Sequence, residues 1–110
     1  MKETLTKFLL RIGVFQCYAG YPYFVSAVEM AIENPWRLSN IRQEIYRPLA
    51  ARYGVSLSCI EKDIRTIRDV IVRNNGLAIL EKMTGQSFYY RNPPFPKEVI
   101  QIFAECFRPD

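Results

Sequence analysis

The hydrophobic side chains recur along most of the chain with the period of an α-helix, and strand-like alternation is almost absent. This periodicity predicts an all-α fold, a compact bundle of about six helices. We expect the helices at residues 2–12, at 22–33, after residue 39 or 40 as far as 53, at 57–73, at 77–84 and at 97–107. The aromatic and proline-rich segment 86–96 is predicted to be a loop.

The third predicted helix contains a proline. Its start is expected beside Ser39 or Asn40, because both side chains are good N-caps. Pro48 lies further along, and proline lacks an amide hydrogen and clashes with the preceding turn. We therefore expect a kink or a restart, with Pro48 near the first turn of the restarted segment.

The fourth predicted helix has two distinct faces. Ser56 is its expected N-cap, although Ser58 with Glu61 also fits a capping box, and the sequence "NNG" at residues 74–76 is expected to end it. One narrow stripe is apolar and comprises Ile60, Ile64, Ile67 and Ile71. The opposite side is polar and comprises Ser58, Lys62, Arg65, Thr66 and Asp69. One face is therefore predicted to pack in the core and the other to remain free.

The residues before this helix fit a helix-turn-helix over residues 41–74. Ala50 is small where the second helix would cross the first, Gly54 tolerates a positive φ in the turn, and Ile60 with Ile64 would anchor the second helix. Such motifs present basic and short polar side chains to the major groove of DNA. The pattern indicates a recognition helix, and the competing interpretation is a tight corner that serves only packing.

Composition narrows the class of protein. The chain has 110 residues, of which 49% are hydrophobic and 24% charged, and this fits one domain over residues 1–110. Its apolar runs are far shorter than a membrane span and no signal-peptide pattern is present, so we expect no membrane partner and a cytoplasmic location. With no histidine and three widely spaced cysteines, no metal, cofactor or enzymatic activity is predicted. Tyr21, Tyr23 and Trp36 are expected to pack at helix entrances.

The net charge of +4 is unevenly distributed. Between Arg42 and Arg73 lie seven basic and four acidic side chains. A basic surface of this kind attracts the phosphates of nucleic acid, and the candidate contacts are Arg42, Arg47, Arg52 and Arg68. The alternative is a solvated helix face with ion pairs one turn apart, such as Glu61 with Arg65.

Several blocks of sequence resemble one protein family. They are "FLLRIGV" followed by "GYPYFVSAVEMAIEN", then "IYRPLAARYGVSLSCIEKDIR", then "LEKMTG" and the closing helix. Together they resemble the C-terminal DNA-binding effector domain of the master response regulator of sporulation in endospore-forming bacteria.

The resemblance implies an all-helical domain that controls transcription by sequence-specific DNA binding through the helix beginning near Leu57. It also implies head-to-tail pairing of two copies on tandem sites, with the last helix contributing to the pair. A contact with the sigma subunit of RNA polymerase is implied for Leu77, Glu81, Lys82 and Ser87.

The chain departs from the family pattern in three respects. No segment resembles the phosphoacceptor receiver domain that normally precedes the effector domain. The family's base-reading arginine near the first turn is Cys59 here, and its next two arginines are Lys62 and Arg65. Asp63 replaces a small residue. The predicted base-reading positions are therefore Ser58, Cys59, Lys62, Arg65 and Thr66.

Two hypotheses follow for the function. The first is a transcription regulator that binds duplex DNA through the helix-turn-helix. The second is a protein-interaction module with the same fold, which pairs through its last helix and has lost DNA reading. A continuous positive face would favour the first, and a face interrupted by Glu61, Asp63 and Asp69 would favour the second.

Overall fold

The computed structural model describes residues 3–109, and within this range every regular element is a helix. The predicted all-α class is thereby confirmed. In chain order the elements are α1 (Leu5–Arg11), α2 (Tyr21–Glu33), the 3₁₀-helix η1 (Pro35–Asn40), the π-helix η2 (Arg42–Tyr46), α3 (Arg47–Tyr53), α4 (Leu57–Arg73), α5 (Gly76–Thr84) and α6 (Pro96–Phe107).

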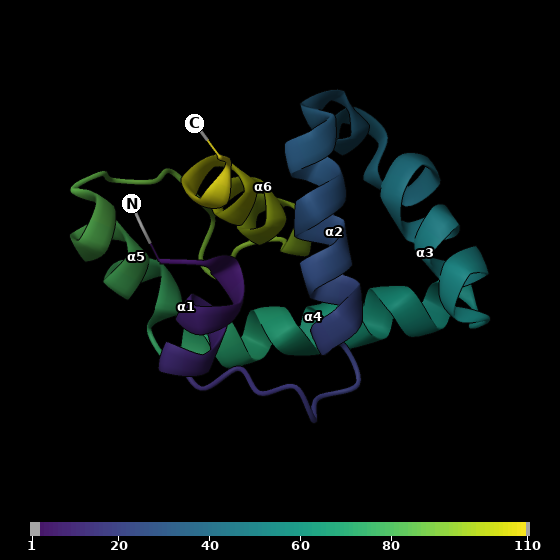
Figure 1. The fold of residues 1–110 in the computed structure, drawn as a ribbon, viewed down its shortest axis with the longest axis horizontal. Coiled ribbons are helices and arrows are strands. Elements are labelled where there is room, and N and C mark those ends of the chain that lie inside the picture. Colours follow the sequence, from purple (N-terminus) through teal and green to yellow (C-terminus); the bar gives the residue numbers. More distant parts are fainter. Residues whose placement is uncertain (1–2, 110) are drawn as a thin grey trace.

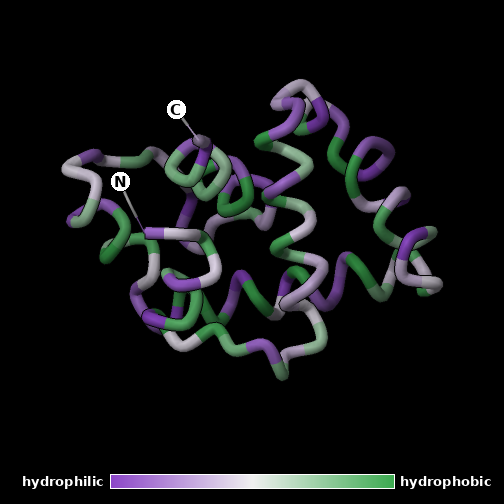
Figure 2. The backbone as a smooth tube through the Cα atoms, in the orientation of Figure 1, coloured by the Kyte–Doolittle hydropathy of each residue, from purple (hydrophilic) through white to green (hydrophobic). Residues whose placement is uncertain are grey.

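Helix α4 forms the base of the molecule, and α2 and α6 pack against it and against each other (Figure 1). Helix α3 lies at one end of α4 and α5 at the other, so α4 joins the two sides of the fold. Green hydrophobic segments alternate with purple hydrophilic ones along each helix, as amphipathic packing requires (Figure 2). The core contains a group of phenylalanine rings, in which Phe103 meets Phe8 and Phe24 edge to face at centroid distances of 5.8 and 5.3 Å.

Helix α1 begins later than its hydrophobic pattern predicted. The predicted start at Lys2 lies outside the described residues, and the helix begins at Leu5 because the Thr4 hydroxyl accepts a hydrogen bond from the Lys7 amide. Helix α2 begins at Tyr21, one residue before the predicted Pro22. Proline still occupies the first turn, where its missing amide hydrogen has no cost.

The region between α2 and α3 differs most from the prediction. Ser39 and Asn40 are not N-caps, because Asn34 caps a 3₁₀-helix that already contains both of them. The chain then forms the wider π-turns of η2, and α3 restarts with Pro48 in its first turn, as predicted. A π-helix at this point fits the chemistry of proline, which cannot continue the regular α-helical ladder.

The predicted ends of α4 and α5 are largely confirmed. The Ser56 hydroxyl accepts a hydrogen bond from the Cys59 amide at 3.1 Å, whereas Ser58 is already helical, so the alternative cap is wrong. Helix α5 starts at Gly76, one residue earlier than predicted, and ends at Gly85 with φ +70°. Helix α6 likewise starts one residue early, at Pro96.

Candidate nucleic-acid interface

A tight corner joins α3 to α4. Gly54 ends α3 in the left-handed region with φ +65°, and the amides of Gly54 and Val55 both donate to the Ala50 carbonyl. A Cβ at Gly54 would have no other atom within 4 Å, so the backbone conformation, and not a lack of space, favours glycine there. Ala50 is half-buried, while Ile60 and Ile64 are completely buried beneath the corner. This geometry fits the packing roles predicted for all four residues.

The polar face of α4 is open to solvent. The side chains of Ser58, Lys62, Arg65 and Thr66 are exposed, and all four were predicted to face DNA. Thr66 also donates to the Lys62 carbonyl at 3.2 Å, which is a common way for a helical threonine to satisfy its hydroxyl. These side chains lie together on one surface, opposite the buried isoleucines.

Cys59 lies on the edge of this face and points toward the rest of the protein. It is half-buried, and its thiol donates to Oδ2 of Asp63 at 3.4 Å. The hydrogen bond to the Asp63 carboxylate is the main reason that the pKa of the Cys59 thiol lies above its usual value. A base-reading role for Cys59 therefore stays a prediction.

The other edge of the polar face carries Glu61. Its Oε2 lies 3.6 Å from Nε of Arg42, which comes from η2. Tyr46, also from η2, is buried beside the same edge, and burial raises its pKa to about 12, with Glu61 adding to the shift and Arg65 opposing it. Glu61 therefore connects the polar face of α4 to the segment before α3.

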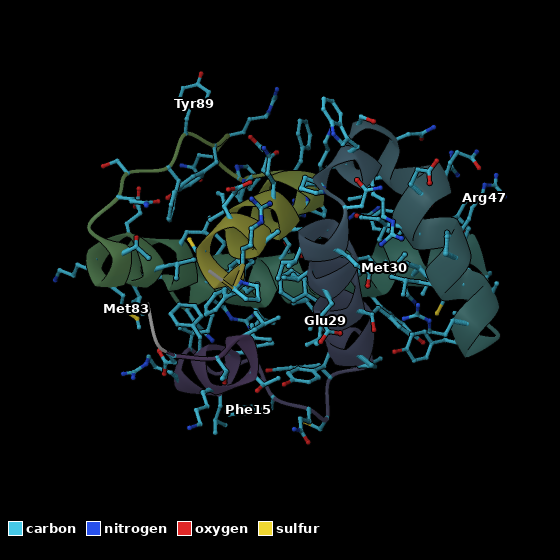
Figure 3. All side chains as sticks on the ribbon, turned by 45° about the horizontal axis from the view of Figure 1, so that its top comes forward. Phe15, Glu29, Met30, Arg47, Met83 and Tyr89 are labelled. Carbon is cyan, nitrogen blue, oxygen red and sulfur yellow. The ribbon has the colours of Figure 1, made fainter. Side chains whose placement is uncertain are left out.

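The four arginines predicted to contact phosphates differ in their surroundings. Arg47 and Arg52 are exposed and form no ion pair with any residue in the range 3–109, and Figure 3 shows Arg47 projecting outward from α3. Arg42 is exposed but pairs with Glu61. The Arg68 side chain is only 14% exposed and donates at 2.7 Å both to Asp69 and to the Pro94 carbonyl. Its guanidinium holds the loop at Pro94 in place, so a phosphate contact by Arg68 would require breaking these two interactions.

The four residues that the family resemblance associates with the polymerase sigma subunit differ in their exposure to solvent. Leu77 is buried, and Glu81 accepts a hydrogen bond from the Phe88 amide at 2.8 Å, so both have roles within the fold. Lys82 and Ser87 are exposed. Of the four residues, these two are available to a partner without a change in the structure.

The sequence did not predict two contacts that hold α3 against α2. The hydroxyls of Ser26 and Tyr53 are hydrogen-bonded at 3.0 Å, and Tyr23 meets Tyr53 edge to face at 5.0 Å. Nothing in the periodicity marks pairs so far apart in the chain. Among residues 3–109, no cluster of three potential metal ligands is present, and none of the helices is both long and apolar enough to cross a membrane.

The family model described as sporulation initiation factor Spo0A C terminal matches residues 5–107 of the chain. No solved structure matches it.

Proposed function

The chain belongs to the family of the C-terminal domain of the sporulation initiation factor Spo0A, a DNA-binding effector domain of a transcription regulator, and we propose that it reads duplex DNA sequence-specifically through α4. The observation that carries this proposal is the open polar face of α4, set by the corner at Gly54. The buried isoleucines on the opposite side fix this face outward.

In this proposal the first turns of α4 enter the major groove. Lys62 and Arg65 supply donors for the acceptor atoms of guanine, and Ser58 and Thr66 supply short hydroxyls that suit either donor or acceptor edges. Phosphate contacts come from residues on η2 and α3, namely Arg42, Arg47 and Arg52. Such contacts position the helix without carrying sequence information.

Two of the three acidic residues of α4 pair with arginines of the same chain. Glu61 pairs with Arg42, Asp63 accepts from the Cys59 thiol, and Asp69 pairs with Arg68. The charges of Glu61 and Asp69 are thus partly offset by arginines, whereas the neutral thiol leaves the charge of Asp63 in place. This pairing favours DNA binding over the second hypothesis.

The family relation supports two further partners. We propose that two copies pair on tandem sites, with α6 in the interface, and that Lys82 and Ser87 contact the polymerase sigma subunit. Both interactions would place the protein in the cytoplasm with the chromosome. Chemical cross-linking tests the proposed pairing of two copies, by comparing a duplex that has one binding site with a duplex that has two.

Selection from a pool of randomised duplexes, followed by sequencing, tests DNA reading. The purified chain should enrich a defined sequence, and Arg65→Ala should lose part of that preference. Lys7→Ala is the matched control, because Lys7 is an exposed cation on α1, which carries none of the residues proposed to contact DNA or a second copy. A folded protein that retains no duplex at about 50 mM salt would refute DNA binding, because non-specific binding is strongest at low salt.

A further inference from the structure

Cys59 and Asp63 form a contact at the edge of the recognition surface. They lie one helical turn apart on α4, and the thiol donates to the carboxylate at 3.4 Å. Both side chains are half-buried, in contrast to the exposed Lys62 and Thr66 beside them. The contact therefore directs residue 59 away from the polar face.

Helix α2 closes this edge from the other side. Gly20, at the start of α2, lies so close that a Cβ there would be 2.2 Å from the Asp63 carbonyl oxygen. One turn further along α2, Tyr23 faces the same edge, where burial raises the pKa of its hydroxyl and the nearby Cys59 and Asp63 add to the shift. Tyr23 is in turn held edge to face by Tyr53. The Cys59–Asp63 pair thus occupies a flank whose backbone is fixed by α2.

We propose that Asp63 is a specificity-determining residue, because its carboxylate holds the side chain at position 59 on the α2 flank and withdraws that position from base reading. The inference rests on the proposed function, since it assumes that α4 lies in the major groove. Asp63 itself contacts no base in this proposal. It acts through the residue at position 59.

The proposal makes positions 59 and 63 interdependent. An arginine at position 59 would be long enough to reach a guanine edge. It would also stand one turn before Asp63, the spacing at which opposite charges on a helix pair. The Asp63 carboxylate would form an ion pair with the guanidinium at position 59. A contact between that guanidinium and a base therefore requires an uncharged residue at position 63.

Selection from the randomised duplex pool with four proteins tests this interdependence. They are the wild type, Cys59→Arg, Asp63→Ala and the double variant. We expect the double variant alone to gain a guanine preference of at least about fivefold at one base pair. Cys59→Arg combined with Asp69→Ala is the matched control, because it removes an equal charge from an exposed position on the same helix. This control should bind all duplexes more tightly without a new base preference.

A second measurement needs no DNA. In a Cys17→Ser, Cys106→Ser background, Cys59 is the one thiol left, and its alkylation rate at pH 8 reports on the contact. Asp63→Ala should accelerate alkylation, since the carboxylate raises the pKa of the thiol, and Asp69→Ala should not. An equal rate in both variants would show that Asp63 does not hold Cys59 and would overturn the inference.

The possible outcomes separate the two proposals. If the wild type retains no duplex, the proposed function fails and the inference falls with it. If the wild type enriches a sequence and Cys59→Arg alone gains the same base preference as the double variant, only the inference is wrong. If the folded double variant gains no preference, position 59 does not face a base, which also refutes the inference. Thermal unfolding of each variant verifies that it is folded.

Discussion

Replacing Gly20 with alanine should destabilise the protein by pushing α2 away from α4. The new Cβ would lie 2.2 Å from the Asp63 carbonyl oxygen, 2.7 Å from its carbon and 2.9 Å from Cγ1 of Ile67. Cβ atoms in proteins essentially never approach a heavy atom closer than 3.0 Å. The two closest atoms belong to the backbone of a central helix, so they cannot rotate away as a side chain could. The helices must separate.

The magnitude follows from two opposing effects. Forcing additional atoms into a packed contact costs about 1–3 kcal/mol. Gly20 has φ −80° and ψ −7°, which alanine adopts readily, so the substitution also stiffens the unfolded chain and recovers about 0.4–1 kcal/mol. We expect a net loss of about 1–2 kcal/mol. For a domain of this size, that loss lowers the melting temperature by roughly 5–10 °C.

Urea unfolding followed by circular dichroism measures the loss directly. Gly85→Ala is the control, because Gly85 has φ +70° and no atom within 4 Å of an added Cβ. The free energy of unfolding of this control should fall by about 1 kcal/mol, because alanine is strained in the left-handed conformation. A Gly20→Ala protein whose unfolding free energy lies within about 0.5 kcal/mol of the wild type would refute the close approach of α2 to Asp63.

Three further predictions concern the recognition surface and its support. If about four phosphates are neutralised, a plot of the logarithm of the DNA association constant against the logarithm of salt concentration should have a slope near −4. Arg52→Ala should reduce the magnitude of this slope by about one and weaken binding to all sequences alike. An unchanged slope would exclude Arg52 as a phosphate contact. Arg65→Ala should cost about 1–3 kcal/mol on the selected duplex and much less on a scrambled one, and equal losses in the two titrations would argue against base reading. The pKa of Tyr46 is raised from 10.0 to about 12, so folding favours the neutral phenol, and the unfolding free energy should fall as pH rises from about 10 to 12. Tyr46→Phe should reduce this fall in a urea titration at each pH, and an identical pH profile would contradict the burial of the hydroxyl.

The sequence predicted the elements whose signals are local. The start of α4 depends on Ser56, a single side chain that caps the amide three residues later. The end of α3 depends on Gly54, because a left-handed residue there favours glycine. The buried stripe of α4 repeats with the helical period. Each of these signals lies within one or two turns of the feature that it specifies, so no knowledge of the tertiary fold is needed.

Features that depend on distant partners were not predictable from such signals. Arg68 looked like one more surface cation, but its guanidinium reaches the Pro94 carbonyl on another segment. Cys59 was expected to face outward, yet it is half-buried and its thiol donates to the Asp63 carboxylate. Trp36 was expected to pack at a helix entrance and is 81% exposed, so that prediction is wrong. Hydropathy indicates how apolar a side chain is and not whether a neighbour covers it.

The two edges of α4 have different consequences for DNA binding. Glu61 pairs with Arg42 at 3.6 Å near the surface, where an ion pair contributes only about 0–1 kcal/mol. A phosphate can therefore displace the carboxylate, and Arg42 stays available to DNA. Asp63 differs, because Gly20 lies against its backbone and the carboxylate already accepts from Cys59. The backbone of Asp63 is thus fixed by α2, and its carboxylate is held by the Cys59 thiol at 3.4 Å. In our proposal, the exchangeable carboxylate on one edge adjusts affinity for any duplex, whereas the carboxylate on the other edge determines which base goes unread.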